Sequence, residues 1–324
     1  MRSIILVAAA LAFAASGAKA QEGRLTLYTS QPNTDAQRTV DAFHARYPKL
    51  EVSFVRDGTP RILARLKAEI AAGDPKADCL LIADSLSMEE LKREGLLLAY
   101  DKADISAFPA GIHDRDKSWF ATKLITTGIV YNIHAAMKPS SWADLARPEA
   151  KGLTVLPSPL ASGAALIHTA TLSANLKQGW RFYEELKANG AIAIGGNGDV
   201  LRQVAGGEKL YGMIVDFMPI REKAKGAPVE FVFPAEGVSA VSEPVAILRS
   251  SKNPEAAKAF VDFLLSPDGQ RLALEMGYIP ALPTLGLPPG YPERSAIRLM
   301  PFDPVATLAT EAEDRRRFES IFGQ

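Results

Sequence analysis

Short apolar runs alternate with amphipathic runs along the chain, and this alternation limits the folds open to it. Near the N-terminus, three strand-like runs are each followed within a few residues by a run with helical spacing of apolar side chains. The expected strands are residues 24–30, 51–55 and 77–83, and the expected helices are residues 35–47, 61–72 and 88–94. Repeated strand–helix units predict an α/β fold with helices on the faces of a sheet.

A second α/β series follows after a strand region at residues 119–133. Its expected strands are residues 154–156, 192–195 and 211–215, and its expected helices are residues 164–172, 178–189, 200–205 and 220–225. Strands at 229–233 and 245–248 and helices at 253–265 and 270–275 come next. A charged helix at 311–322 is expected on the surface. A chain of 324 residues exceeds the usual size of one hydrophobic core, so two lobes are expected.

The first twenty residues have the features of a secretory signal. Arg2 supplies a basic start, residues 4–15 are apolar, and Ala18-Lys19-Ala20 is a small-x-small cleavage site. We therefore expect cleavage after Ala20 and a mature protein in the periplasm.

Composition and residue spacing exclude several classes of function. Lysine plus arginine and aspartate plus glutamate both number 37, so the basic bias of nucleic-acid binders is missing and no nucleic-acid partner is expected. Cys79 is the only cysteine, and the four histidines show no metal-ligand spacing. Ser162 lacks the first glycine of the hydrolase motif G-x-S-x-G. We expect no catalytic residue, cofactor or metal, and a periplasmic hydrolase is only a remote alternative.

Polar residues and glycines gather where the expected strands end. The first three strands lead into Thr29-Ser30-Gln31, Asp57-Gly58-Thr59 and Asp84-Ser85. Ligands of open α/β sheets bind outside the carboxyl ends of the strands. These loops therefore predict one half of a site for a polar ligand.

The turn at Ser162 and Gly163 is the candidate for the other half. It follows the strand that ends at Pro157 and precedes the helix that starts at Ala164, with Ser162 as the expected N-cap. A helix N-terminus offers unpaired N–H groups and a positive dipole end to an anion. Taken alone, the turn is more simply explained as a helix cap. Opposite a loop containing Gly58, it becomes the best candidate for an anion cradle.

Four stretches carry a family likeness. They are residues 27–30 followed by a helix, residues 55–59, residues 142–145 ahead of the Ser162 turn, and residues 252–270. Through them the sequence resembles the periplasmic solute-binding proteins of ABC importers, in the extracellular solute-binding family 1. Within that family it resembles the cluster of ferric-iron, phosphonate and sugar-phosphate binders. The likeness extends over residues 24 to about 285.

The resemblance implies a type II-like periplasmic-binding-protein fold, in which each lobe is a mixed sheet flanked by helices and the ligand lies in the interlobe cleft. Residues 21–125 plus 246–324 would form lobe 1 and residues 126–245 lobe 2, with hinge strands near 126–133 and 233–248. The implied function is capture of a small anionic organic ligand by hinge closure and its delivery to an ABC permease in the inner membrane. The protein is expected to be a monomer.

The residues Asp216 and Phe217 distinguish this chain from the iron binders of that cluster. The iron binders carry a tyrosine pair there, so ferric iron remains a disfavoured alternative. The phosphonate and organophosphate binders resemble this chain at residues 56–59, at residues 158–164 and at Asp216. The expected ligand is therefore a phosphonate such as 2-aminoethylphosphonate, or a sugar phosphate, whose ammonium or hydroxyl end would meet Asp216. A general interaction protein of the envelope is a third alternative, and the polar loops argue against it.

Hydroxyl groups and backbone N–H groups suit phosphoryl oxygens, and Gly58 and Gly163 would let the backbone approach them. The expected ligand-binding residues are Ser30, Gly58, Thr59, Ser85, Thr127, Ser162, Gly163, Ala164, Asn197 and Asp216. Of these, Ser85, Thr127 and Asn197 rest more on loop position than on motif.

Overall fold

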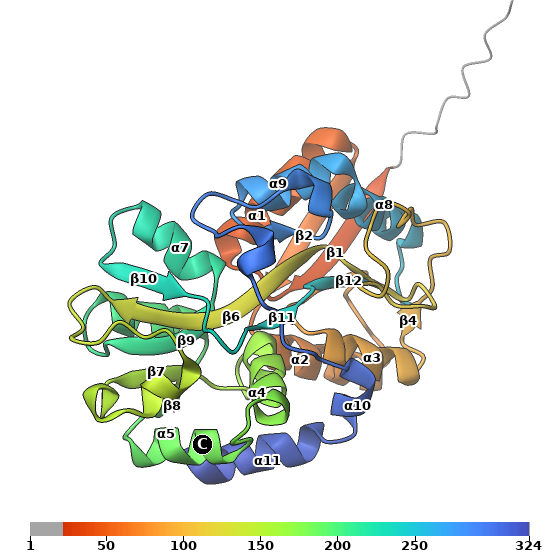
Figure 1. Ribbon diagram of the computed structural model, residues 1–324. Coiled ribbons are helices and arrows are strands. Elements are labelled where there is room, and N and C mark those ends of the chain that lie inside the picture. The colour runs from red at the N-terminus through yellow and green to blue at the C-terminus, as the bar shows by residue number, and fades with distance from the viewer. Residues whose placement is uncertain (1–21, 324) are drawn as a thin grey trace, which may run out of the picture.

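Two mixed sheets organise residues 22–323, the part of the chain that the computed structural model describes. Each sheet carries helices on its faces, and the two lobes lie side by side (Figure 1). The predicted signal segment, residues 1–20, lies outside the described residues. Within residues 22–323, every helix is too short or too polar to cross a bilayer.

The first sheet contains the strand–helix units nearest the N-terminus. Its strand order is β2 (Leu50–Arg56), β1 (Gly23–Thr29), β3 (Cys79–Leu81), β12 (Pro244–Leu248) and β4 (Leu97–Leu98), with β5 (Trp119–Ala121) also paired to β12. The pairs β1–β2 and β1–β3 are parallel, and β12 is antiparallel to β3. The carboxyl ends of β1, β2 and β3 therefore meet at one edge, as the sequence predicts.

Helices cover both faces of this sheet because successive side chains of β1 point to opposite faces. Leu27 packs into one core with Phe43 and Phe260, and Tyr28 packs into another with Ile62. The helices of this lobe are α1 (Asn33–Arg46), α2 (Thr59–Ala71), α3 (Ser85–Arg93), α8 (Pro254–Leu265) and α9 (Pro267–Glu275).

The second sheet is built around one long strand, β6 (Lys123–Asn132). Its order is β10 (Val229–Val232), β6, β9 (Tyr211–Val215), β7 (Thr154–Pro157) and β8 (Ile192–Ile194), with β11 (Ser239–Val241) and β13 (Ile279–Pro280) also paired to β6. Its helices are α4 (Gly163–Asn175), α5 (Arg181–Ala188), α6 (Asn197–Ala205) and α7 (Phe217–Ala224). Short 3-10 turns lie at Trp142–Ala146, Pro148–Ala150, Pro283–Leu285 and Arg294–Ala296.

The chain passes between the sheets at two adjacent points and once more after α9, where β13 pairs with the start of β6. It leaves the first sheet at Thr122, between β5 and β6, and returns at Ser242 and Glu243, between β11 and β12. The backbone N–H of Thr122 donates to the Ser242 carbonyl at 3.2 Å, and the Thr122 hydroxyl donates to the Glu243 carbonyl at 2.7 Å. The first crossing comes before the expected hinge at 126–133, because β6 pairs within the second sheet along its length.

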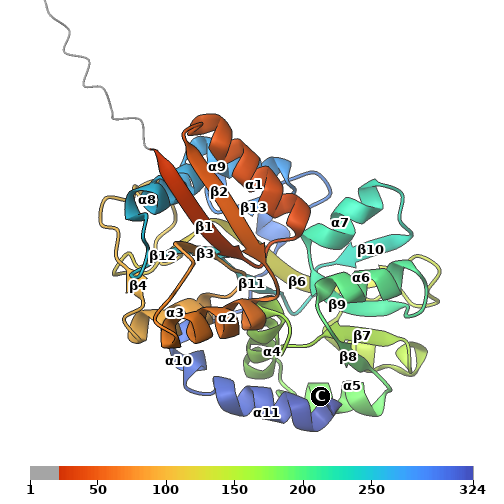
Figure 2. The same cartoon turned by 180° about the vertical axis from the view of Figure 1, so that it is seen from behind.

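The C-terminal segment spans both lobes. Helix α10 (Pro304–Leu308) packs against α3, and α11 (Glu311–Phe322) packs against α5 and α4 (Figure 2). The expected surface helix therefore has a buried face, since Phe318 and Phe322 enter the core of the second lobe. This helix lies with the second lobe, whereas the predicted division assigns all of residues 246–324 to lobe 1.

Candidate functional site

A cavity of about 570 Å³ lies between the lobes, at the carboxyl ends of β1, β2, β7 and β8. This volume suits a small organic ligand. Seven of the ten predicted site residues line the cavity: Ser30, Gly58, Thr59, Ser162, Gly163, Ala164 and Asn197. The expected meeting of the two sets of loops around one space is thus seen in the structure.

The other three predicted residues do not line this cavity. Ser85 is buried at the start of α3, and Thr127 is buried within β6. Asp216 is fully buried inside lobe 2. Its Oδ2 accepts from the N–H and hydroxyl of Thr126 at 3.0 and 2.7 Å, and its Oδ1 accepts from the N–H of Phe217 at 2.7 Å. Asp216 therefore ties β6 to the start of α7, and the structure does not place it where it could meet the ligand.

Helix α2 begins at the cavity, and hydrogen-bonding groups at its N-terminus lack partners. No side chain caps its N-terminus, where Gly58 is the N-cap. Thr59 is 1% exposed, and its Oγ1 has no hydrogen-bond partner within residues 22–323. A buried hydroxyl without a partner is costly, so a ligand acceptor at this point would stabilise the protein. The positive end of the α2 dipole favours an anionic acceptor.

Helix α4 begins at the facing wall, and Ser162 is its N-cap, as predicted. The Oγ of Ser162 accepts from the N–H of Ala165 at 3.3 Å and from the Asn197 amide at 3.2 Å. The Asn197 Oδ1 accepts in turn from the N–H of Val215 at 3.1 Å, so this side chain joins the starts of α4 and α6 to β9. Both lone pairs of Ser162 are occupied, and its hydroxyl proton is left to donate into the cavity.

Gly58 and Gly163 line the cavity at the points where the two lobes meet. A Cβ at Gly58 would lie 2.3 Å from the carbonyl oxygen of Ala161, and a Cβ at Gly163 would lie 2.7 Å from the Cβ of Asp84. Both glycines thus let the two lobes touch in this structure. Their predicted close approach to a ligand stays a prediction.

Charged residues of the cavity form a group that lies outside the ten predicted site residues. Its arginines are Arg56, Arg61 and Arg202, and its acidic residues are Asp57, Asp199 and Glu243. The three carboxylates are each paired: Asp57 with Arg61 at 3.6 Å, Asp199 with Arg202 at 2.9 Å, and Glu243 with Lys123. Arg56 differs, since its Nε donates to the Gln31 carbonyl at 2.8 Å and it has no carboxylate partner in the described chain. Its position at the end of a predicted strand could have revealed Arg56.

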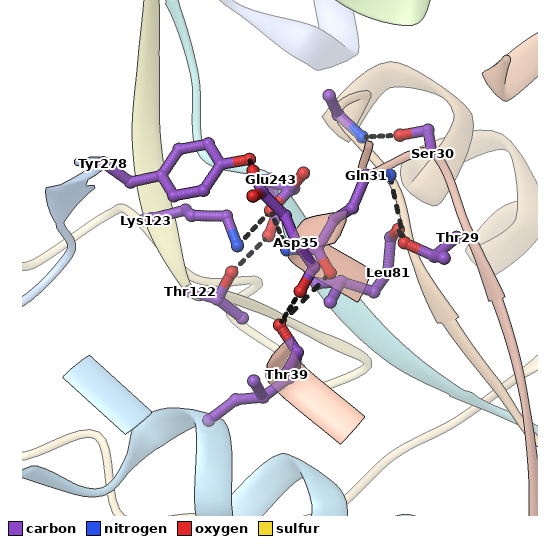
Figure 3. Close-up of polar contacts among 12 residues, drawn as sticks. Thr29, Ser30, Gln31, Asp35, Thr39, Leu81, Thr122, Lys123, Glu243 and Tyr278 are labelled. Atoms are coloured by element: carbon purple, nitrogen blue, oxygen red, sulfur yellow. Dashed lines mark hydrogen bonds and ion pairs between the residues drawn. The ribbon is translucent and has the colours of Figure 1, made fainter. Parts of the chain in front are cut away.

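A buried ionic cluster lies beside the crossings (Figure 3). Arg221 of α7, in lobe 2, donates to Asp35 of α1, in lobe 1, at 2.8 Å, and the Tyr278 hydroxyl donates to the same carboxylate. Lys123 and Glu243 form the second pair of the cluster. The Arg221–Asp35 contact joins the two lobes directly.

Within residues 22–323, no three or more His, Cys, Asp or Glu side chains are grouped so that they could hold a metal ion. No tyrosine of the described residues lines the cavity. Asp216, where the resemblance implies the tyrosine pair of the iron binders, is fully buried and is held by Thr126 and Phe217.

These features define a class of protein: a two-lobe binding protein with a cavity for a small ligand between its lobes. Residues 74–306 match the family model described as bacterial extracellular solute-binding protein. The chain belongs to this family, whose members bind solutes for transport and are not enzymes. The two-lobe fold and the family expected from the sequence are thereby confirmed.

Known relatives differ in the ligand that they bind. An uncharacterised protein of Haemophilus influenzae is 29% identical over 287 residues, covering 85% of this chain and 82% of that protein. The Fe(3+)-binding periplasmic protein of Serratia marcescens is 25% identical over 272 residues, covering 81% and 79%. The structure of the periplasmic binding protein AfuA from Actinobacillus pleuropneumoniae, with fructose-6-phosphate bound, matches at a TM-score of 0.81. It is 25% identical, with 94% of this chain and 97% of that chain covered.

Proposed function

We propose that this protein is the periplasmic substrate-binding component of an ABC importer, and that it captures a small organophosphorus anion, a phosphonate or a phosphate ester. One observation carries the proposal. The carboxylates of the cavity are all paired within the protein, whereas several of its hydrogen-bond donors are free. A cavity of this kind favours a ligand with several acceptor oxygens and a negative charge.

The free donors match a phosphoryl group. The Arg56 guanidinium can make charge-assisted hydrogen bonds, and the hydroxyls of Thr59 and Ser162 can each donate one. The N-termini of α2, α4 and α6 open into the same cavity and add positive potential. The phosphate ester bound by AfuA supports this choice.

Cationic ligands suit the cavity less well. A polyamine needs carboxylates free to pair with its ammonium groups, and those of Asp57, Asp199 and Glu243 already have cationic partners. Ferric iron needs several anionic oxygen ligands. The described residues contain no group of three or more His, Cys, Asp or Glu side chains that could hold a metal, and no tyrosine among them lines the cavity. Iron is therefore the second candidate, kept because a relative is named for binding it.

The mode of action that we propose is hinge closure. Ligand binding would draw the lobes together until Gly58 meets Ala161, and the closed form would deliver its ligand to a permease of the inner membrane. The signal-like first twenty residues and the periplasmic relatives support a periplasmic location.

The test is a thermal-shift and calorimetry panel on the mature protein. We expect stabilisation by fructose 6-phosphate or a phosphonate, of about 2.7 kcal/mol when the free ligand is at about 100 times its Kd. The panel also contains inorganic phosphate, putrescine and Fe(III). Stabilisation by Fe(III) or putrescine alone would refute the proposed ligand class.

A matched pair of variants connects the result to the cavity. Arg56→Gln removes the free guanidinium, and Arg38→Gln removes an exposed arginine of α1 that does not line the cavity. We expect the first to weaken organophosphate binding about tenfold or more, as for a lost hydrogen bond to a charged group, and the second to leave it unchanged. Equal effects of the two substitutions would argue against a phosphoryl group at Arg56.

A further inference from the structure

Of the three carboxylates that line the cavity, Glu243 is the most deeply buried. It lines the cavity, although only 2% of its surface is exposed. Its backbone has a φ of 31°, a left-handed conformation that is unusual for a residue other than glycine. The Thr122 hydroxyl fixes this backbone by donating to the Glu243 carbonyl at 2.7 Å. Strained backbone that is held in this way is often found at functional sites.

The two carboxylate oxygens of Glu243 have different surroundings. Oε2 contacts the Lys123 ammonium and accepts from the Gln31 amide at 3.4 Å (Figure 3). Across the described part of the chain, the printed contacts of this carboxylate are all made by Oε2, and Oε1 accepts no hydrogen bond. Glu243 lines the cavity, so this oxygen has lone pairs that a donor group of the ligand could use.

We infer that Glu243 selects the second end of the ligand: its Oε1 accepts a hydrogen bond from a hydroxyl group and discriminates against an ammonium group. This inference rests on the proposed function, because it assumes that the phosphoryl end occupies the helix N-termini. Glu243 then takes the role that the sequence assigned to Asp216 as the partner of that second end. Asp216 itself is fully buried and does not line the cavity.

Charge balance decides between hydroxyl and ammonium. Lys123 and Arg221 bring two positive charges to the cluster, and Glu243 and Asp35 bring two negative charges. A ligand ammonium at Glu243 would add a buried positive charge with no counter-charge left to pair with it. A hydroxyl adds no charge and needs only an acceptor, which Oε1 supplies.

The location of Glu243 also suits a selecting residue. It lies at the second crossing, hydrogen-bonded to the first crossing through Thr122, so its position depends little on how far the lobes have closed. A ligand already held at this point would meet the α2 and α4 N-termini as the lobes come together.

The direct test uses the unmodified protein and two ligands that differ in one group, 2-hydroxyethylphosphonate and 2-aminoethylphosphonate. We expect the hydroxyl compound to bind at least about tenfold more tightly by calorimetry, as for one hydrogen bond to a charged group. Equal affinity, or tighter binding of the amine, would overturn the inference. Failure of both compounds would overturn it too, while binding of fructose 6-phosphate would still uphold the proposed function. If no organophosphorus compound binds, both fail.

A variant tests whether Glu243 is the cause. Glu243→Met removes the acceptor, but alone it would leave Lys123 buried without its partner, so it is combined with Lys123→Met. We expect the double variant to bind 2-hydroxyethylphosphonate about tenfold more weakly, which reduces the hydroxyl preference, and to keep its affinity for inorganic phosphate.

The control is Glu89→Gln, at a buried glutamate that accepts from the Trp119 indole at 2.8 Å outside the cavity. It should keep the hydroxyl preference in full. A double variant that folds, by its melting curve, and retains that preference would overturn the assignment to Glu243. If the double variant does not fold, the ligand pair on the unmodified protein still decides.

Discussion

Buried titratable side chains of the second lobe respond to pH in opposite directions. Burial lowers the pKa of His168 to about 3 from its ordinary value of 6.5, and burial raises the pKa of Asp216 to about 6 from 3.8. The folded state thus favours the neutral form of both groups. The contribution of His168 to stability is present above pH 6.5 and is lost as the pH falls. That of Asp216 is present below pH 3.8 and is lost as the pH rises through about 6.

His168→Gln separates these two effects. It removes the titrating ring and keeps a side chain able to hydrogen-bond to Ser239, whose hydroxyl lies 2.8 Å from the His168 Nδ1. Below pH 6.5, the free energy of unfolding of the unmodified protein should fall relative to that of the variant by about 1.4 kcal/mol per pH unit. Urea denaturation at about pH 7 and about pH 5 measures this difference. A difference independent of pH would show that His168 is not enclosed in its neutral form.

Single residues also show what the sequence could and could not predict about the site. Ser30, Thr59 and Ser162 were found because each follows a predicted strand, and the carboxyl ends of parallel strands meet at one edge. Asp216 follows a strand as well, but its side chain turns back to Thr126 on β6, a pairing that local sequence does not reveal. Glu243 was missed because its place depends on the contact between the two crossings, 121 residues apart at Thr122 and Glu243.

At the scale of elements, α11 combines a charged sequence with a structural role. Phe318 is fully buried, with its ring centroid 4.7 Å from that of Phe322 and 6.1 Å from that of Tyr183 on α5. Its charged residues hid this face in the sequence. The short elements β4, β11, β13 and α10 were also not predicted. Each is too short to show a period of its own and depends on contacts with β12, β6 or α3.

Phe318→Ala should lower the free energy of unfolding by about 3 kcal/mol or more, because it leaves a cavity in the core. Arg316→Ala, at an exposed position of the same helix, should change it by less than about 0.5 kcal/mol. Urea denaturation of both variants makes the comparison. Similar small effects would mean that α11 lies loosely on the surface, as the sequence alone suggested.

At the scale of the whole molecule, the closure that we propose would rest on contacts between the two lobes. Arg221 reaches from α7 to Asp35 of α1, and Gly58 and Gly163 allow the backbones of the two lobes to meet. The two lobes therefore share an ionic contact near the crossings, between Arg221 and Asp35, and a steric contact at the N-terminus of α2, at Gly58.

Gly58→Ala should prevent full closure without unfolding the protein. The Gly58 backbone has a φ of −60°, which alanine adopts easily, but the new Cβ would lie 2.3 Å from the Ala161 carbonyl oxygen. We expect ligand affinity to fall at least about tenfold, while the melting temperature of the ligand-free protein stays the same or rises slightly.

Gly196→Ala is the matched control, because this glycine also lines the cavity and its Cβ would meet nothing within 4 Å. Calorimetry and small-angle scattering with and without ligand would compare the two variants. If Gly58→Ala keeps both full affinity and ligand-induced compaction, the lobes do not close through this contact.

The C-terminal segment makes a further connection between the lobes and limits how far they can separate. Helix α10 lies on α3 and α11 on α4 and α5, and only Ala309 and Thr310 join the two helices. Two extended residues span about 7 Å, so a wider opening on this side must detach one of the helices. α10 has no buried side chain, whereas α11 is anchored by Phe318 and Phe322, so α10 would be released first. The segment thus limits the range of interlobe motion. Small rotations of the lobes leave it intact, whereas large rotations require the weak contact between α10 and α3 to break.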